Sequence, residues 1–298
     1  MRHGESPVGA GEVERTGSPT VSVVIPTLNE RSNLAFVFAA LPAGLLEVVL
    51  VDGRSTDGTV EEARRLMPDI RVVHQTGKGK GNALACGFHA CRGDIIVMID
   101  ADCSTDPGEI PAFVAVLVEG ADFAKGSRFV SGGGSDDITR LRRGGNRALN
   151  GLVNVLFRTR YTDLCYGYNA FWAKHLPVLH LDPTPRADPT KMLWGDGFEI
   201  ETLINVRVAR AQLAITEVPS FEAARQFGVS NLNAVSDGLR VLRTVYTEFR
   251  RPRPDVIAAT RRSTASAAVP GQNSGHAVAA RGLNPHEPQP VVVEQAGS

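Results

Sequence analysis

The sequence predicts an α/β fold with a mostly parallel central sheet, and three observations lead to that prediction. Short runs of β-branched residues alternate with amphipathic stretches four times, at a spacing of about 20–25 residues. Each run ends at a polar or glycine-rich turn. Apolar residues make up 43% of the 298 residues, which is ample for a single core. Alternation of this kind is typical of βαβ units, whose strands lie parallel.

The first half of the chain contains the alternating elements. We expect a first strand at residues 21–25, ended by Pro26, and then a helix capped by Asn29 or Ser32. Further strands are expected at residues 48–51, 70–73 and 94–100, with helices at residues 59–67, at residues 82–90 and after Asp106. The strand at residues 94–100 is the most apolar, so we expect it at the centre of the sheet.

Beyond Ser127 the alternation stops. The glycine-rich residues 132–137 predict a flexible loop, followed by an amphipathic helix at about residues 140–157. A helix from about Phe198, a strand at residues 214–218 and a last helix complete a single predicted domain at residues 20–251. Residues 1–19 and 252–298 contain few large apolar side chains, and we expect both tails to be disordered.

The overall composition excludes several classes of protein. Basic and acidic residues number 32 each, so no global field favours nucleic acid as a partner. No apolar run reaches the roughly 18 residues of a membrane span, and the first residues do not resemble a signal peptide. We therefore expect a cytoplasmic protein, free or peripheral at the inner face of the membrane. The four cysteines lack metal-binding spacing, which favours free thiols over disulfides.

Polar or glycine-rich residues follow each of the first four strands, where a parallel sheet binds its ligands. Asp100-Ala101-Asp102 is the sharpest of these signals. Two carboxylates on alternate residues predict one side chain toward a ribose and one toward a divalent ion, Mg²⁺ or Mn²⁺. The alternative is that Asp102 merely starts a turn, but Asp106 already accounts for the cap of the next helix.

The turn at residues 77–81 contains Gly77, Gly79 and Gly81 with two lysines between them. Such a turn can bring backbone N–H groups close to a phosphate, with Lys78 or Lys80 adding a positive charge. It does not match the Walker pattern, and a solvated basic turn is the alternative.

Several segments in order resemble the family 2 glycosyltransferases of the GT-A fold. These segments are Val-Val-Ile-Pro-Thr-Leu-Asn-Glu (23–30), Val-Asp-Gly-Arg-Ser-Thr-Asp-Gly-Thr (51–59), Gly-Lys-Gly-Asn-Ala-Leu (79–84) and Asp-Ala-Asp (100–102). Later segments are similar to the branch that contains the dolichyl-phosphate mannose and glucose synthases. They are Lys-Gly-Ser-Arg (125–128), Asp-Leu-Cys-Tyr-Gly-Tyr-Asn-Ala-Phe (163–171) and Glu-Val-Pro (217–219).

The resemblance implies an inverting, metal-dependent hexosyltransferase that takes a sugar from a UDP- or GDP-sugar. Residues 20–127 would form the nucleotide-sugar-binding half and residues 128–251 the acceptor half. The residues implied to contact the donor are Pro26, Thr27, Glu30, Asp52, Lys80, Asp100, Ala101 and Arg225. Asp102 would hold the metal with Ser104, which stands where mannose synthases often carry Gln. Arg128 would lie between the donor phosphate and the acceptor.

The acceptor is left open between a polyprenyl phosphate and a soluble hydroxyl. Arginines on two amphipathic segments favour a lipid phosphate at an anionic membrane, although surface helices packed on the core are an equal alternative. These arginines are Arg140, Arg142, Arg143, Arg147, Arg240, Arg243, Arg250, Arg251 and Arg253.

A hydroxyl acceptor would need a general base, and we select Glu199 from the candidates Asp196, Glu199 and Glu201. The alternative for each of them is an acid at a helix N-terminus. Two other functions are weighed against sugar transfer. A sugar nucleotidyltransferase is disfavoured because no glycine-rich loop follows the first strand, and a non-catalytic nucleotide-sugar-binding protein would tolerate loss of the metal.

Overall fold

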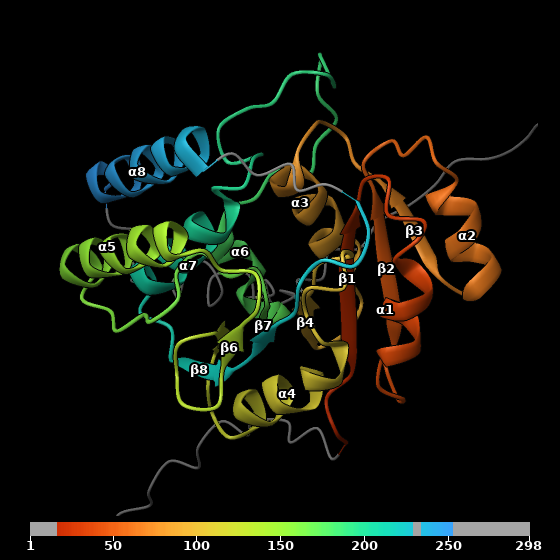
Figure 1. Cartoon of the computed structure of the whole chain (residues 1–298), viewed down its shortest axis with the longest axis horizontal. Helices are drawn as coiled ribbons and strands as arrows, with labels where there is room; N and C mark the ends of the chain where they lie inside the picture. Colours follow the sequence, from red (N-terminus) through yellow and green to blue (C-terminus); the bar gives the residue numbers. More distant parts are fainter. Residues whose placement is uncertain (1–16, 229–233, 253–298) are drawn as a thin grey trace, which may run out of the picture. The chain divides into compact units, whose positions relative to one another are not determined.

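A computed structural model describes residues 17–228 and 234–252, which all belong to one compact unit (Figure 1). The sequence predicts disordered tails at residues 1–19 and 252–298. Most of these residues lie outside the described ranges. The predicted α/β class is confirmed, and all four cysteines are free thiols, as predicted.

A seven-stranded sheet in the order β3-β2-β1-β4-β7-β5-β8 forms the centre of the domain. Its strands are β1 (Val21–Thr27), β2 (Glu47–Asp52), β3 (Arg71–His74), β4 (Ile95–Met98), β5 (Phe123–Ser127), β7 (Asn169–Trp172) and β8 (Ile215–Pro219). Only β7 runs antiparallel to its neighbours among these strands, so the predicted mostly parallel sheet is confirmed. The predicted central place of β4 is also confirmed.

Helices cover both faces of the sheet. They are α1 (Leu34–Ala40), α2 (Thr59–Leu66), α3 (Lys80–Ala90), α4 (Ile110–Val118), α5 (Arg140–Phe157), α6 (Leu176–Leu179), α7 (Ile200–Arg210) and α8 (Ala234–Arg250). Helices α1, α2 and α4 contribute to the apolar cluster on one face, and α3, α6 and α7 contribute to the cluster on the other.

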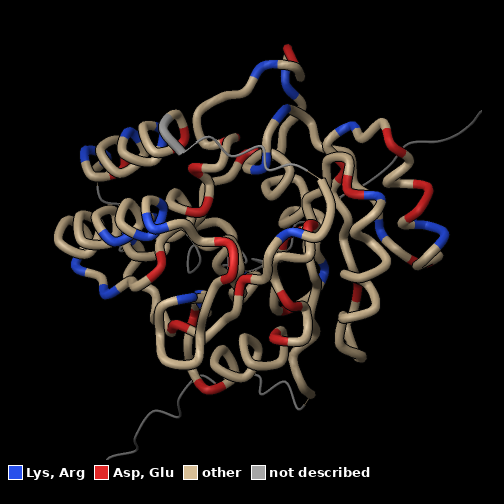
Figure 2. The backbone as a smooth tube through the Cα atoms, viewed as in Figure 1, with Lys and Arg blue, Asp and Glu red and all other residues tan. Residues whose placement is uncertain are grey.

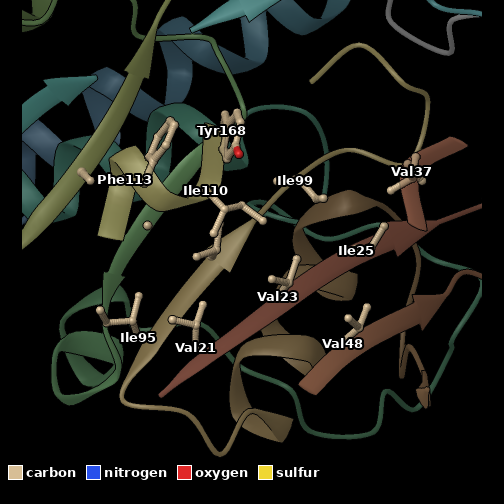
Figure 3. Packing of buried hydrophobic residues seen from close by; sticks show 14 of the residues in the cluster. Val21, Val23, Ile25, Val37, Val48, Ile95, Ile99, Ile110, Phe113 and Tyr168 are labelled. Atoms are coloured by element: carbon tan, nitrogen blue, oxygen red, sulfur yellow. The ribbon is translucent and has the colours of Figure 1, made fainter. Parts of the chain in front are cut away.

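Alternation along the strands builds the two clusters. In β1, Val23 and Ile25 point to the face shared with Ile110 and Phe113, as Figure 3 shows, whereas Val24 belongs to the opposite cluster. All five side chains are 0–1% exposed. Burial of one such side chain contributes roughly 1.5–3 kcal/mol, so the sheet and its two helical layers stabilise each other.

Helices α5 and α8 form a further layer outside α7. Val153 of α5, Val206 of α7 and Val245 of α8 are all buried in one cluster. The rings of Phe157 and Phe249 meet edge to face at 6.2 Å, so α5 and α8 lie side by side (Figure 1). Because α7 lies between this layer and the sheet, nearly all of it is buried.

Some predictions about local structure are wrong. Neither Asn29 nor Ser32 caps α1, whose N-cap is Asn33 without a side-chain bond. Instead, the Asn29 side chain accepts a hydrogen bond from the Thr56 N–H at 2.8 Å. The predicted loop at 132–137 contains a short strand, β6 (Gly134–Ser135), because it pairs with β9 (Phe221–Glu222) from a distant part of the chain.

Two boundaries also differ from the prediction. Strand β1 continues through Pro26, where the missing N–H is tolerated because β4 pairs only with Val21–Val24. Helix α3 begins at Lys80, two residues before the predicted start, and so takes in part of the glycine-rich turn.

Candidate active site

The parallel pairing brings the carboxyl ends of four strands to one edge of the sheet. Thr27 of β1 lies beside Asp52 of β2, which lies beside His74 of β3. On the other side of β1, Ile99 donates its N–H to Val24, so Asp100 follows at the same edge. The sheet itself therefore brings the four polar strand ends together at the edge where a parallel sheet binds its ligands.

Asp52 organises the loop that follows β2. Its buried carboxylate accepts hydrogen bonds from the N–H groups of Arg54 and Ser55 at 3.0 and 3.2 Å. The imidazole of His74 lies 3.4 Å from the same carboxylate. Asp52 thus determines the shape of this strand end, and its contact with a nucleotide base stays a prediction.

Asp100 is joined to two side chains from other elements. The Lys80 ammonium, on the first residue of α3, lies 2.6 Å from a carboxylate oxygen of Asp100 and 2.6 Å from one of Glu201. Burial alone would lower the pKa of Lys80, but the two carboxylates outweigh it and hold the pKa well above its usual range. Burial raises the pKa of Glu201. Lys80 therefore stays charged and bridges α7 to the end of β4.

Gly79 and Gly81, at the start of α3, allow the backbone of residues 195–196 to approach closely. A Cβ at Gly81 would lie 1.9 Å from the carbonyl oxygen of Gly195, and one at Gly79 would lie 2.1 Å from that of Asp196. The Gly81 N–H donates to the Asp196 carbonyl at 2.8 Å. The Gly81 N–H is therefore already bound by the protein backbone and is not available to a phosphate, whereas an approach of a phosphate to the rest of this turn stays a prediction.

Asp102 lies in an ion-pair network of its own. One carboxylate oxygen lies 2.7 Å from the guanidinium of Arg225, and the other accepts the Ser104 N–H at 3.0 Å. Arg225 also lies 3.3 Å from Glu30, whose pKa is raised by burial. The structure thus brings together Glu30, Asp102, Ser104 and Arg225, and separates Asp102 from the network of Asp100. The roles of these residues toward a donor and a metal stay predictions.

Arg128 is buried in a cluster of acids. Its guanidinium makes two hydrogen bonds to Asp163, at 2.6 and 2.9 Å, and one to Glu222 at 2.8 Å. It also lies over the Tyr166 ring, 4.8 Å from the centroid. Burial would raise the pKa of Asp163, but the bonds from Arg128 outweigh it and lower the pKa. In this arrangement Arg128 links β5 to the loop after α5 and to β9, and its catalytic role stays a prediction.

The predicted base Glu199 is also buried. It lies just before α7 and accepts the N–H of Gly195 at 2.9 Å. Its other oxygen lies 3.9 Å from the guanidinium of Arg240 on α8. Asp196 accepts the N–H of Leu193 at 2.8 Å. Both acids hold the loop ahead of α7, and neither touches Asp100 or Asp102 through an observed bond or ion pair.

Comparison with known proteins identifies the family. Residues 22–176 match the model of the family described as glycosyl transferase family 2. The chain belongs to glycosyl transferase family 2. This glycosyltransferase is 31% identical to Glycosyltransferase AglJ of Haloferax volcanii over 78% of its own length and 73% of that protein. It is 31% identical to polyprenol monophosphomannose synthase of Mycolicibacterium smegmatis, over 77% and 88% of the two chains.

Solved structures confirm the GT-A fold of this glycosyltransferase. Glucosyl-3-phosphoglycerate synthase from Mycobacterium tuberculosis, crystallised with Mn²⁺, UDP and glucosyl-3-phosphoglycerate, is similar with a TM-score of 0.57. That likeness covers 78% of this chain and 81% of the other at 25% identity. The resemblance inferred from the ordered motifs is thus confirmed, including the branch of the dolichyl-phosphate mannose and glucose synthases, since proteins named polyprenol monophosphomannose synthase and undecaprenyl-phosphate mannosyltransferase are among the relatives.

The side chains around Asp102 suit a metal that takes part of its ligands from outside the protein. Within residues 17–228 and 234–252, no three His, Cys, Asp or Glu side chains converge on one point. A cation nevertheless occupies this place, since the Arg225 guanidinium is held by Asp102 and Glu30. Mg²⁺ commonly takes one or two carboxylates and completes its shell with phosphate oxygens and water. The site fits that pattern and does not fit a self-sufficient metal cage.

Lys125 opens the Lys-Gly-Ser-Arg segment that carries part of the family resemblance, but the sequence did not predict that its charge is buried. It lies in β5 with 0% exposure, and its ammonium donates to the carbonyls of Gly126 and Tyr166 at 2.8 Å each. Burial lowers the pKa of Lys125 to about 8, although Asp163 and Glu217 act in the opposite direction. The usable sequence signal was a lysine inside an otherwise strand-like run.

This pKa predicts a pH dependence of stability. Between pH 8 and about 10.4, folded Lys125 is neutral while the unfolded chain keeps the proton, so folding releases a proton and stability rises with pH. Relative to a Lys125→Met variant, the wild-type free energy of unfolding should rise by about 2–3 kcal/mol across this window. Urea denaturation of both proteins at pH 7, 8, 9 and 10 measures it, and a constant difference would refute the lowered pKa.

Proposed function

We propose that this glycosyltransferase moves a sugar, with inversion, from a UDP- or GDP-sugar to a polyprenyl phosphate at a membrane surface. The observation that carries the proposal is the edge of the sheet where Asp100 and Asp102 lie in two separate charge networks. Two neighbouring carboxylates with different partners suit two different tasks on one donor. Relatives named for polyprenol or undecaprenyl phosphate support the acceptor.

Each network is assigned to a part of the donor. Asp102, with Ser104 beside it, would hold Mg²⁺ or Mn²⁺, and Asp100 would meet the ribose, with Lys80 orienting it. The same strand ends are lined or supported by other residues that the resemblance assigns to the donor: Pro26, Thr27, Glu30, Asp52 and Ala101. When bound, the metal would stabilise the charge that develops on the leaving diphosphate. The proposal draws support from the related structures crystallised with UDP and Mn²⁺ or Mg²⁺.

The outer surface of α5 and α8 supports a lipid acceptor. Large apolar side chains there are strongly exposed: Leu141 by 80%, Val155 by 79%, and Leu239 and Tyr246 by 63% each. Arginines recur along both helices, as Figure 2 shows. Apolar groups mixed with positive charge suit the interface of an anionic bilayer. None of the helices in the described part of the chain has the length and apolar character of a membrane span.

Two substitutions test this surface. Replacing both Val155 and Leu239 with Asp should weaken binding to vesicles of phosphatidylcholine with phosphatidylserine by at least about tenfold, because apolar area is lost and negative charge is added. Co-sedimentation measures the binding. Val118→Asp is the matched control, since Val118 is 58% exposed but lies on α4, away from this surface. Equal loss in both variants, or no loss in either, would refute the assignment.

The donor and acceptor can be tested together. The full chain with Mn²⁺ is incubated with GDP-mannose, UDP-glucose and related donors, with and without polyprenyl phosphate. We expect nucleoside diphosphate to be released from one donor, with sugar appearing on the lipid in the complete mixture. A polyprenyl phosphate is already an anion, so this transfer needs no general base. If no donor is bound or hydrolysed, the proposed function is wrong.

A soluble hydroxyl acceptor is the second candidate, and one observation favours it. The Glu199 oxygen that lies 3.9 Å from the Arg240 guanidinium is buried and accepts no hydrogen bond in the described part of the chain. Such an oxygen could take a proton from a hydroxyl. Transfer to a soluble alcohol without lipid, lost in Glu199→Gln, would favour this candidate over the lipid phosphate.

A further inference from the structure

Arg225 forms an ion pair with Asp102, the carboxylate that the proposed function assigns to the metal. Its guanidinium lies 2.7 Å from Asp102 and 3.3 Å from Glu30. Both carboxylate side chains are only 14% exposed, so little solvent screens them. Because the second oxygen of Asp102 accepts the Ser104 N–H, Arg225 takes the oxygen that remains.

The segment that carries Arg225 is anchored on both sides of it. We call residues 223–228 the strap. On one side, the Ala223 N–H donates to the Ser104 carbonyl at 2.9 Å. On the other, the Phe227 ring lies 5.8 Å from that of Phe36 on α1, and the Asn33 side chain donates to the Phe227 carbonyl at 3.4 Å. The contacts of the strap therefore place Arg225 beside Asp102, just after β4.

A guanidinium and a divalent ion compete for this carboxylate. The Asp102 oxygen that pairs with Arg225 is the one that does not accept the Ser104 N–H, and like charges at contact distance repel strongly where water is partly excluded. A metal at that oxygen would therefore displace Arg225 from it. Displacement would leave the Arg225 guanidinium beside the site without a carboxylate partner, unless another anion binds it.

We propose that Arg225 is a stand-in cation that keeps Asp102 closed to the metal until the donor diphosphate arrives. The proposal rests on the proposed function, in which metal and diphosphate bind together. The diphosphate would supply ligands to the metal and would give Arg225 a new anionic partner. Metal alone then binds weakly, and metal and nucleotide bind cooperatively.

Metal binding without nucleotide tests the proposal independently of catalysis. Free Mn²⁺ is measured by electron paramagnetic resonance while the full chain is titrated, with no nucleotide present. In Arg225→Gln, which keeps much of the side-chain length but removes the charge, Mn²⁺ affinity should rise about three- to tenfold. Arg225→Lys keeps the charge and should stay close to the wild type. An unchanged or lower affinity in Arg225→Gln would overturn the proposal.

A matched control separates competition at Asp102 from a general change in the electrostatic potential at the site. Arg54 lies at the same edge and donates to the Pro189 carbonyl instead of pairing with Asp102. If Arg54→Gln raises Mn²⁺ affinity as much as Arg225→Gln does, the proposal is wrong. Adding Asp102→Asn to Arg225→Gln should remove the gained affinity, and retention of that gain would also overturn it.

Cooperativity gives a second readout. UDP or GDP should raise the Mn²⁺ affinity of the wild type by a larger factor than that of Arg225→Gln, because in the variant the site is already open. Equal factors would contradict the proposal. Sugar transfer is measured separately, so its absence together with the expected Mn²⁺ results would refute the proposed function and leave the stand-in role of Arg225 standing.

Discussion

Replacement of Asp102 with asparagine is expected to lower the rate of sugar transfer by about 100- to 10,000-fold. The change removes the carboxylate charge proposed to hold the metal, whose stabilisation of the leaving diphosphate is worth several kcal/mol, with about 1.4 kcal/mol per factor of ten. The fold should survive, because an asparagine oxygen can still accept the Ser104 N–H seen at 3.0 Å. Initial rates at saturating donor and Mn²⁺ measure the effect.

Asp106→Asn is the matched control for this variant. Asp106 lies four residues further along the same loop, where its side chain accepts the Gly108 N–H and caps a short 3₁₀ helix (Pro107–Glu109) ahead of α4. Asparagine caps helices about as well as aspartate, so transfer should remain near the wild-type rate. Wild-type turnover in Asp102→Asn would show that Asp102 does not hold a catalytic metal. Donor binding without turnover in the wild type would instead support a non-catalytic binding protein.

Replacement of Arg128 with methionine should destabilise the protein by about 3–5 kcal/mol. Asp163 is 0% exposed and Glu222 is 8% exposed, and both lose the group that compensates their charge. The free energy of unfolding from urea denaturation measures the loss. A loss below about 1 kcal/mol would mean that the buried network contributes little to stability.

A second substitution separates charge compensation from loss of packing. In Arg128→Met with Asp163→Asn, one of the two buried charges is removed, and part of the lost stability should return. Asn146 donates to Asp163 at 2.8 Å and can do the same to an asparagine oxygen, so that contact is retained. No recovery in the double variant would assign the loss to packing on Tyr166 and Phe129 instead.

Charge retention tests the catalytic role of Arg128 separately from its stabilising one. Arg128→Lys keeps the charge but loses the paired hydrogen bonds to Asp163. If this variant folds stably, a fall in kcat would support a role near the reacting groups, and an unchanged kcat would refute it.

Local sequence patterns predicted the elements that depend on neighbours in the chain. Helix α5 spans Arg140–Phe157, as its apolar period and preceding Thr139 cap allow, and β1 to β4 lie where the β-branched runs occur. Strands β5 and β7 were missed. Lys125 interrupts β5, and its charge is accepted there because two backbone carbonyls bind its ammonium. The Gly126 carbonyl belongs to the same strand, but the Tyr166 carbonyl comes from 41 residues further along the chain and cannot be anticipated from the sequence around the strand.

In the candidate site, too, the sequence predicted some features, and others depend on the tertiary structure. The acids at 100 and 102 follow a buried strand, and that order alone places both at the ligand-binding edge of the sheet. Their different partners come from distant parts of the chain, Glu201 through Lys80 for Asp100 and Arg225 for Asp102. Such pairings depend on how α7 and the strap pack on the sheet.

The sequence by itself therefore determined the α/β class, the ordered motifs of the family and the edge where the site lies, because these follow from local period and strand order. Only the tertiary structure decided that Gly79 and Gly81 accommodate the backbone at 195–196, and that Arg128 is enclosed by Asp163 and Glu222. The physical reason is that close approach and charge compensation arise between segments far apart in the chain. No local pattern encodes where those segments meet.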